Sequence, residues 1–177
     1  MSLRQLTSTE ARTFRAARWA ALRALNYTIG QLNAGNATVA EVWMGVNHRQ
    51  DLKVLAQRLG VIRKALSEIH QAKIFYDTDT NSQSDWYAEV DVTLQGADHA
   101  ITLAQPFFDA TTYGIGSRSS TLIHEFSHFD DVLGTDDNAD GRAACLRLLE
   151  YAQQYDNDLN KVITNADSWA SLVEDSF

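Results

Sequence analysis

The chain has 177 residues, a net charge of −8 and 45% hydrophobic residues, which is ordinary for a globular protein with a real core. The acidic balance argues against nucleic-acid binding through phosphate contacts and against docking on anionic membranes. No apolar run approaches the roughly 20 residues that span a bilayer, and the first residues lack the apolar segment of a secretory signal peptide. The single cysteine, Cys145, excludes an internal disulfide framework.

Helical spacing of apolar residues dominates the first third of the chain. It predicts a helix over residues 8–34, with Ser8 or Thr9 as its N-cap. Two further helical segments are predicted at residues 37–44 and 49–71. We expect no linker or repeat, and therefore one domain over residues 1–177 that is cytoplasmic or exported without a signal peptide.

The middle of the chain changes character and contains short, β-prone runs. Strands are predicted at residues 73–76, 86–92 and 100–103. Helices are predicted from Thr121 to about Leu133, from Arg142 to about Tyr155, and from Ser168 to the end. The pattern predicts an α+β fold, mostly helical, with a small antiparallel sheet beside the helix that starts at Thr121.

That helix contains His-Glu-Phe-Ser-His at residues 124–128. On a helix, His124 and His128 share one face, where two imidazoles can bind a single zinc ion. Glu125 between them can then act as general base on a water that the metal activates, a chemistry used most often to hydrolyse peptide bonds. Such a match also arises by chance around a buried neutral histidine, but the apolar Leu122 and Ile123 favour a helix buried under a cleft.

A catalytic zinc ion usually takes three protein ligands, so a third must come from elsewhere. No third histidine follows at the spacing found in metzincins. An acidic turn does follow, and Gly134 can end the helix and let the chain return toward it. A carboxylate from this returning segment is the expected third ligand. Its polar residues are Asp130, Asp131, Thr135, Asp136, Asp137 and Asp140.

His-Glu-x-x-His-Phe followed by Gly-Thr-x-Asp resembles the aspzincins, the family of deuterolysin and peptidyl-Lys metalloendopeptidase. The resemblance implies a zinc endopeptidase with one zinc ion per chain and a peptide or protein as substrate. It implies that His124, His128 and Asp137 are the zinc ligands and that Glu125 is the general base. Because fungal members carry disulfides that this chain cannot form, the chain looks more like a bacterial relative.

The resemblance extends over most of the chain. Trp-Met-Gly at 43–45 is similar to the family's Trp-Phe-Gly, and Ser-Arg with Thr-Leu-Ile-His-Glu at 117–125 is similar to the run that opens its active helix. Ile-Thr-Leu at 101–103 with Pro-Phe-Phe at 106–108 resembles the preceding strand and turn. Asn-Ala-Asp-Ser at 165–168 resembles the family's closing segment, where Asp167 is expected to be a helix cap.

One departure bears on activity. The family places a tyrosine, expected to stabilise the oxyanion, where this chain has Asp140. An anionic carboxylate would repel a developing oxyanion, so Tyr113, Tyr151 or Arg142 would have to substitute from another direction. Alternatively, the chain is a weakened or inactive member that binds peptides without cutting them.

Other interpretations stay open. The segment 136–141 matches the start of an EF-hand calcium loop, although Arg147 stands where a glutamate is needed. A protease-like toxin with one narrow target would also suit the small size. Thr135, Asp136 and Asp140 are candidates for the substrate pocket, and with Glu150 the two aspartates would favour basic substrates. The oligomeric state is not predicted.

Overall fold

A computed structural model describes residues 2–156 and 159–177. Its helices are α1 (Ser8–Ala34), α2 (Thr38–Met44), α3 (Arg49–Glu68), α4 (Gln105–Asp109), α5 (Arg118–His128), α6 (Arg142–Tyr151), α7 (Asn160–Ile163) and α8 (Ala166–Ser176). Its strands are β1 (Leu3–Gln5), β2 (Ile74–Asp77), β3 (Ala88–Val90) and β4 (Ile101–Leu103). The prediction of a mostly helical α+β fold is confirmed. None of the described helices is long and apolar enough to cross a membrane.

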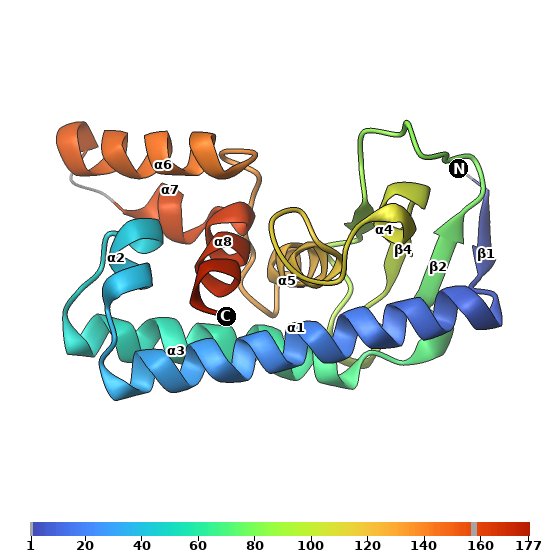
Figure 1. The fold of residues 1–177 in the computed structure, drawn as a ribbon, viewed down its shortest axis with the longest axis horizontal. Helices are drawn as coiled ribbons and strands as arrows, with labels where there is room; N and C mark the ends of the chain where they lie inside the picture. Colours follow the sequence, from blue (N-terminus) through green and yellow to red (C-terminus); the bar gives the residue numbers. More distant parts are fainter. Residues whose placement is uncertain (1, 157–158) are drawn as a thin grey trace.

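Two long antiparallel helices, α1 and α3, lie side by side along the length of the molecule and support the other elements (Figure 1). Helix α1 begins with a capping box in which Thr7 accepts from the Glu10 amide and Glu10 accepts from the Thr7 amide. The N-cap is therefore Thr7 rather than Ser8 or Thr9. Gly35 ends the helix with a left-handed φ of 90°, a conformation that glycine adopts at little cost.

The sheet lies at one end of the molecule and has the strand order β1-β2-β4-β3. The pairs β1–β2 and β3–β4 are antiparallel, but β2 and β4 are parallel. The expected all-antiparallel sheet is therefore wrong in one pair. The chain leaves β2, forms the edge strand β3 and then returns between the two as β4. Strand β1, which was not predicted, has three residues and is too short to display an alternating pattern.

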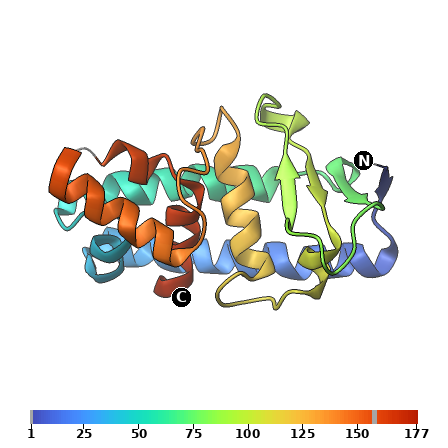
Figure 2. The same ribbon diagram turned by 90° about the horizontal axis from the view of Figure 1, so that it is seen from above.

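Helix α5, which carries the HExxH pattern, lies at the centre, between the strands and α8 and over the two long helices (Figure 2). It buries Leu122 and Phe126 completely in the core. Its N-cap is Ser117, whose side chain accepts from the Ser120 amide. The helix ends at His128, earlier than the predicted Leu133, because the chain then turns and Gly134 donates back to the carbonyl of Phe129.

The C-terminal helices close over the other side of α5. The predicted helix from Arg142 to Tyr155 is α-helical only to Tyr151, and a π-helical turn continues over Ala152–Asp156. Helix α8 starts at Ala166, two residues before the predicted start, and packs against α5. This contact places the polar start of α8 beside the histidines of α5.

Candidate metal centre

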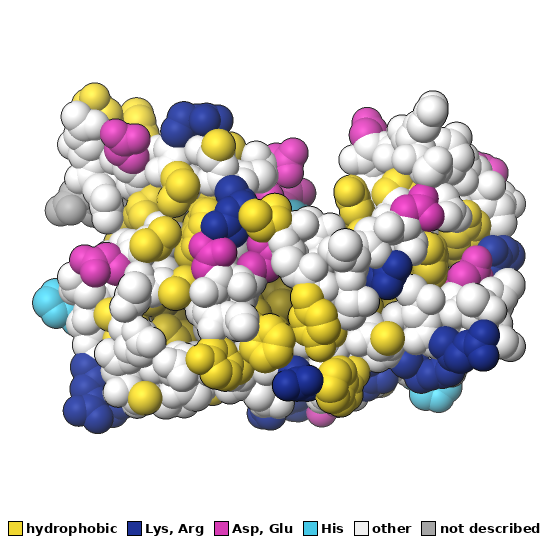
Figure 3. All heavy atoms as spheres, viewed as in Figure 1, with side chains coloured by type: hydrophobic (Ala, Val, Ile, Leu, Met, Phe, Trp, Pro, Cys, Tyr) yellow, Lys and Arg dark blue, Asp and Glu magenta, His cyan; other side chains and the backbone are white. Residues whose placement is uncertain are grey.

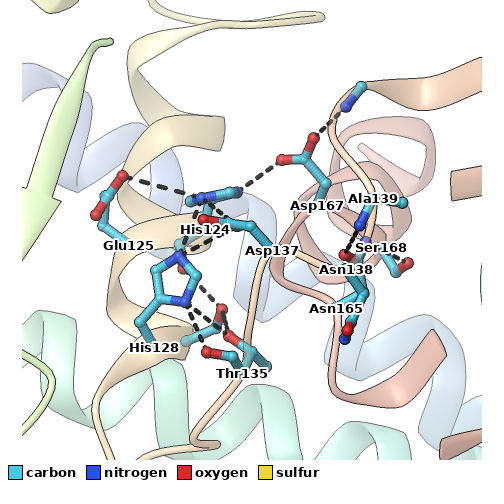
Figure 4. A network of polar contacts seen from close by, with 12 residues as sticks. His124, Glu125, His128, Thr135, Asp137, Asn138, Ala139, Asn165, Asp167 and Ser168 are labelled. Carbon is cyan, nitrogen blue, oxygen red and sulfur yellow. Dashed lines mark hydrogen bonds and ion pairs between the residues drawn. The ribbon is translucent and has the colours of Figure 1, made fainter. Parts of the chain in front are cut away.

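His124 and His128 lie one turn apart on α5 and point toward Asp137, which returns from the turn after the helix (Figure 4). The Nε2 atoms of the two histidines are 3.1 Å apart. The Oδ1 atom of Asp137 lies 3.3 Å from His124 Nε2 and 3.5 Å from His128 Nε2. Tetrahedral zinc at its usual bond lengths of about 2.0–2.1 Å holds its ligands roughly 3.3 Å apart, so these residues fit a zinc ion. The three residues could hold a metal ion together.

The outer nitrogen of each histidine has a partner that fixes the orientation of the ring. His124 Nδ1 donates to Asp167 Oδ1 at 2.6 Å, and His128 Nδ1 donates to the carbonyl of Thr135 at 2.8 Å. In the neutral imidazole, a proton on Nδ1 leaves a lone pair on Nε2. In this neutral form both rings would direct their lone pairs toward the carboxylate of Asp137, an arrangement that a bound cation would satisfy.

The electrostatics of the centre favour a positive charge. Burial alone would lower the pKa of His124, but its contacts with Asp137 and Asp167 outweigh burial and raise that pKa to about 10. The bond to His124 in turn lowers the pKa of Asp137, although burial opposes this. The carboxylates of Asp137 and Asp167 thus attract either a proton or a metal cation to the imidazoles.

Glu125 follows His124 on the helix, and its carboxylate lies beside the candidate ligand atom of His124. Its Oε1 atom is 4.0 Å from His124 Nε2. Burial raises the pKa of Glu125 to about 8, with the neighbouring His124 opposing this rise. A raised pKa makes the ionised carboxylate a stronger proton acceptor, a property that suits a general base.

The turn that carries Asp137 is tied to the end of α5 through Thr135. The hydroxyls of Ser127 and Thr135 are 2.6 Å apart, and the Thr135 amide donates to the Ser127 carbonyl at 3.2 Å. Both side chains are buried. The predicted pocket residue Thr135 is therefore a buried support for His128, and it does not line the cavity beside the site.

That cavity has a volume of about 570 Å³ and reaches Glu125 and two of the three candidate ligands, His124 and Asp137. Figure 3 shows the surface hollowed between the part that carries α6 and the part that carries β3. The lining residues come from β3 and the segment before it, the loop before α5, α5 itself, the acidic turn, the start of α6, and α8. Its acidic members are Asp85, Glu125, Asp137, Asp140, Asp167 and Glu174.

The other predicted pocket residues differ in whether they line the cavity. Asp140 and Arg142 line the cavity, whereas Asp136, Glu150, Tyr113 and Tyr151 are not among its described lining residues. Tyr113 stacks on Phe177, Tyr151 packs on Tyr155, and the backbone of Asp136 bridges to Asn165. Arg142 donates to Asp175 at 2.6 Å. A tyrosine that does line the cavity is Tyr87.

Asp167 is the residue whose role was misjudged from the sequence. Its expected function as a helix cap is wrong, because the N-cap position of α8 is Asn165. Its two oxygens instead accept from His124 Nδ1 and from the Gly141 amide, each at 2.6 Å. It therefore orients one of the three candidate ligands, a role that the local sequence pattern does not indicate.

A helix with two histidines and a returning carboxylate, set in a mostly helical α+β fold, defines a metallopeptidase-like centre. Residues 30–174 match the family model described as Aspzincin_M35, Lysine-specific metallo-endopeptidase. The chain belongs to this family, and the resemblance inferred from the sequence is confirmed. The solved structure of a zinc peptidase from Grifola frondosa has the same fold, with a TM-score of 0.76 and 26% identity over 96% of this chain and 97% of that one.

Curated relatives also match, and several of them are peptidyl-Lys metalloendopeptidases. A peptidyl-Lys metalloendopeptidase of Armillaria mellea is 36% identical over 102 residues, which cover 57% of this chain and 26% of the relative. An extracellular protease of Aeromonas hydrophila is 33% identical over 78 residues, which cover 44% of this chain and 21% of the relative. The matches thus span less than two thirds of the length of either relative.

Proposed function

We propose that this chain is a zinc-dependent endopeptidase that uses His124, His128 and Asp137 as ligands of one zinc ion. The observation that carries the proposal is the convergence of the three ligand atoms, at 3.1, 3.3 and 3.5 Å, beside a buried glutamate and an open cavity. Family membership and the names of the relatives support it. The packing of Phe14 and Val173 into one core cluster supports a single domain over residues 1–177.

When bound, zinc would supply Lewis-acid chemistry, which makes water more acidic and polarises a carbonyl group. The protein's own part is proton transfer and orientation. Glu125 accepts a proton at its carboxylate and returns it to the leaving amine. Asp167 and the Thr135 carbonyl hold the two imidazoles in position, and the cavity admits the peptide.

For the substrate, we propose a preference for peptides with a basic side chain. Four acidic residues besides the ligand and the general base line the cavity: Asp85, Asp140, Asp167 and Glu174. Arg142 opposes them, but it pairs with Asp175, which is not among the described lining residues. Such a cavity concentrates cationic groups. Relatives named as peptidyl-Lys metalloendopeptidases are consistent with this preference.

The alternative is a member of the family that binds peptides without cutting them. The specific observation in its favour is Asp140, a carboxylate that lines the cavity where the family's tyrosine is expected. A negative charge there would destabilise a developing oxyanion. This alternative keeps the zinc site and the cavity but predicts no turnover.

One experiment separates the two functions. We would measure zinc content and the cleavage of quenched fluorescent peptides for wild type, Glu125→Gln and Asp137→Ala. The control is Glu150→Gln, because Glu150 is an exposed residue of α6. If the chain is an active enzyme, every protein except Asp137→Ala should contain about one zinc ion per chain. Only wild type and Glu150→Gln should cleave the peptides. Zinc without turnover in wild type would favour the binding domain, and turnover in Glu125→Gln would refute the mechanism.

The same assay tests the preference for basic substrates. Matched peptides with lysine, glutamate or alanine at each position around the scissile bond would be compared by kcat/KM. We expect lysine to be favoured over glutamate by at least tenfold, and more strongly at low ionic strength because the attraction is electrostatic. Equal rates for the two peptides would refute the preference while leaving the zinc mechanism intact.

A further inference from the structure

Asp137 is the most exposed of the three candidate ligands. Its side chain is 59% exposed, whereas those of His124 and His128 are 20% and 11% exposed. Its carboxylate contacts the two histidines, and each histidine has a separate partner at its outer nitrogen. The position of the Asp137 side chain therefore depends on how the main chain is held before and after this residue.

The main chain before Asp137 is fastened to the segment around Asn165. The Asp136 amide donates to the Thr164 carbonyl at 2.7 Å, and the Asp136 carbonyl accepts from the Ala166 amide at 3.0 Å. Together these bonds form an isolated parallel bridge between Asp136 and Asn165. The residue preceding the ligand is thus held from both sides of Asn165.

The main chain after Asp137 is fastened by the side chain of Asn165 itself. Its Oδ1 atom accepts from the Ala139 amide at 2.7 Å (Figure 4). Its Nδ2 atom donates to Ser168 Oγ at 3.0 Å and contacts Cys145 Sγ at 3.3 Å. Asn165 is completely buried, so water does not compete with these bonds. The amide is held in one orientation, with its oxygen toward the turn.

From this geometry we infer that Asn165 is a positioning residue that fixes Asp137 for metal binding, an inference that rests on the proposed zinc site. The main-chain neighbours of Asn165 hold the turn before Asp137, and its side chain holds the turn after Asp137. Asp167, two residues later, holds His124. The start of α8 therefore sets the spacing between the ligand on the turn and the ligands on α5. Loss of such a supporting group typically weakens metal affinity by about 10–100-fold.

The test is metal binding by the full chain, with Asn165→Ala as the main variant. Asn138→Ala is the matched control, because Asn138 lies on the same turn but is exposed and makes only long contacts of 3.3–3.4 Å with Lys161 and Thr164. Zinc affinity would be measured by competition with a chromophoric chelator. Cobalt would replace zinc to report ligand geometry through its visible absorption spectrum, and urea unfolding of the metal-free proteins would report stability.

We expect Asn165→Ala to bind zinc about 10–100-fold more weakly and to change the cobalt spectrum, while Asn138→Ala matches wild type. Folded Asn165→Ala with wild-type affinity and spectrum would overturn the inference. If Asn165→Ala does not fold, the second variant is Ser168→Ala, which removes one hydrogen bond that orients the Asn165 amide. Ser168→Ala should lower zinc affinity by a few-fold, and unchanged affinity would overturn the inference. Failure of wild type to bind zinc would instead overturn the proposed function, and the inference with it.

Discussion

Replacing Asp167 by asparagine should weaken the metal site without changing its shape. The carboxylate now accepts two hydrogen bonds, one from His124 Nδ1 and one from the Gly141 amide, each at 2.6 Å. An asparagine has one oxygen and one NH₂ group in these places. Whichever way the amide turns, one N–H donor of the protein would face another donor. At least one of the two bonds is therefore lost.

The size of the effect follows from the lost bond and the lost charge. A hydrogen bond to a charged group contributes about 1.5–3 kcal/mol, and the carboxylate also makes the imidazole a stronger ligand. Asp167 is 21% exposed, so solvent screens part of this contribution. We expect a loss of about 1.4–2.7 kcal/mol in zinc binding, which corresponds to a Kd that is roughly 10–100-fold higher.

The assay is zinc competition with a chelator of known affinity, at pH 7 and constant ionic strength. Asp98→Asn is the control, because Asp98 pairs with Lys73 at 2.9 Å with its side chain 73% exposed, and it is not among the candidate ligands. The Asp98→Asn variant should bind zinc with the affinity of wild type. A Kd for Asp167→Asn within twofold of wild type would refute the assignment of Asp167 as a support for His124.

Three further predictions concern the scaffold. Phe126→Ala, at a fully buried site on α5, should lower the free energy of unfolding by about 3–5 kcal/mol in urea, and a loss below 1 kcal/mol would contradict its core role. Gly45→Ala should lower the melting temperature, because Gly45 has a φ of 66° and a Cβ atom there would lie 2.9 Å from Leu149 Cδ1. Gly60→Ala should raise the melting temperature, because Gly60 lies within α3 and a Cβ atom there would meet open space. Glu10→Gln should cost about 1 kcal/mol at pH 7, discounted for the exposure of Arg4, its partner. Arg4 lowers the pKa of Glu10 to about 2, so this stability is present above the ordinary pKa of 4.5 and lost as pH falls toward 2; a difference that persists at pH 2 would refute the pairing.

The features that the sequence predicted are those encoded locally. Helical periodicity located α1 and α3, and the spacing of four residues placed His124 and His128 on one face. Gly134 correctly indicated that the chain turns back after α5. Each of these inferences depends on residues within a few turns of one another, where backbone geometry alone decides which side chains meet.

The features that were missed depend on contacts between distant segments. The parallel pairing of β2 with β4 is set by the path of the chain through β3, which no strand pattern reveals. Asp167 was expected to be a helix cap, but its partner, His124, lies 43 positions earlier in the sequence. The buried amide of Asn165 likewise gives no periodic signal, because a single polar residue has no pattern.

The separation of α5 and α8 in the sequence also has a consequence for the chain before it has folded. The HExxH helix is synthesised first, and the residues that orient His124 and fasten the acidic turn follow about forty positions later. Until α8 docks on α5, the two histidines lack the fixed position of Asp137 and the ring orientation that metal binding requires. A nascent or partly unfolded copy should therefore lack a complete metal centre until the C-terminal part of the chain has folded.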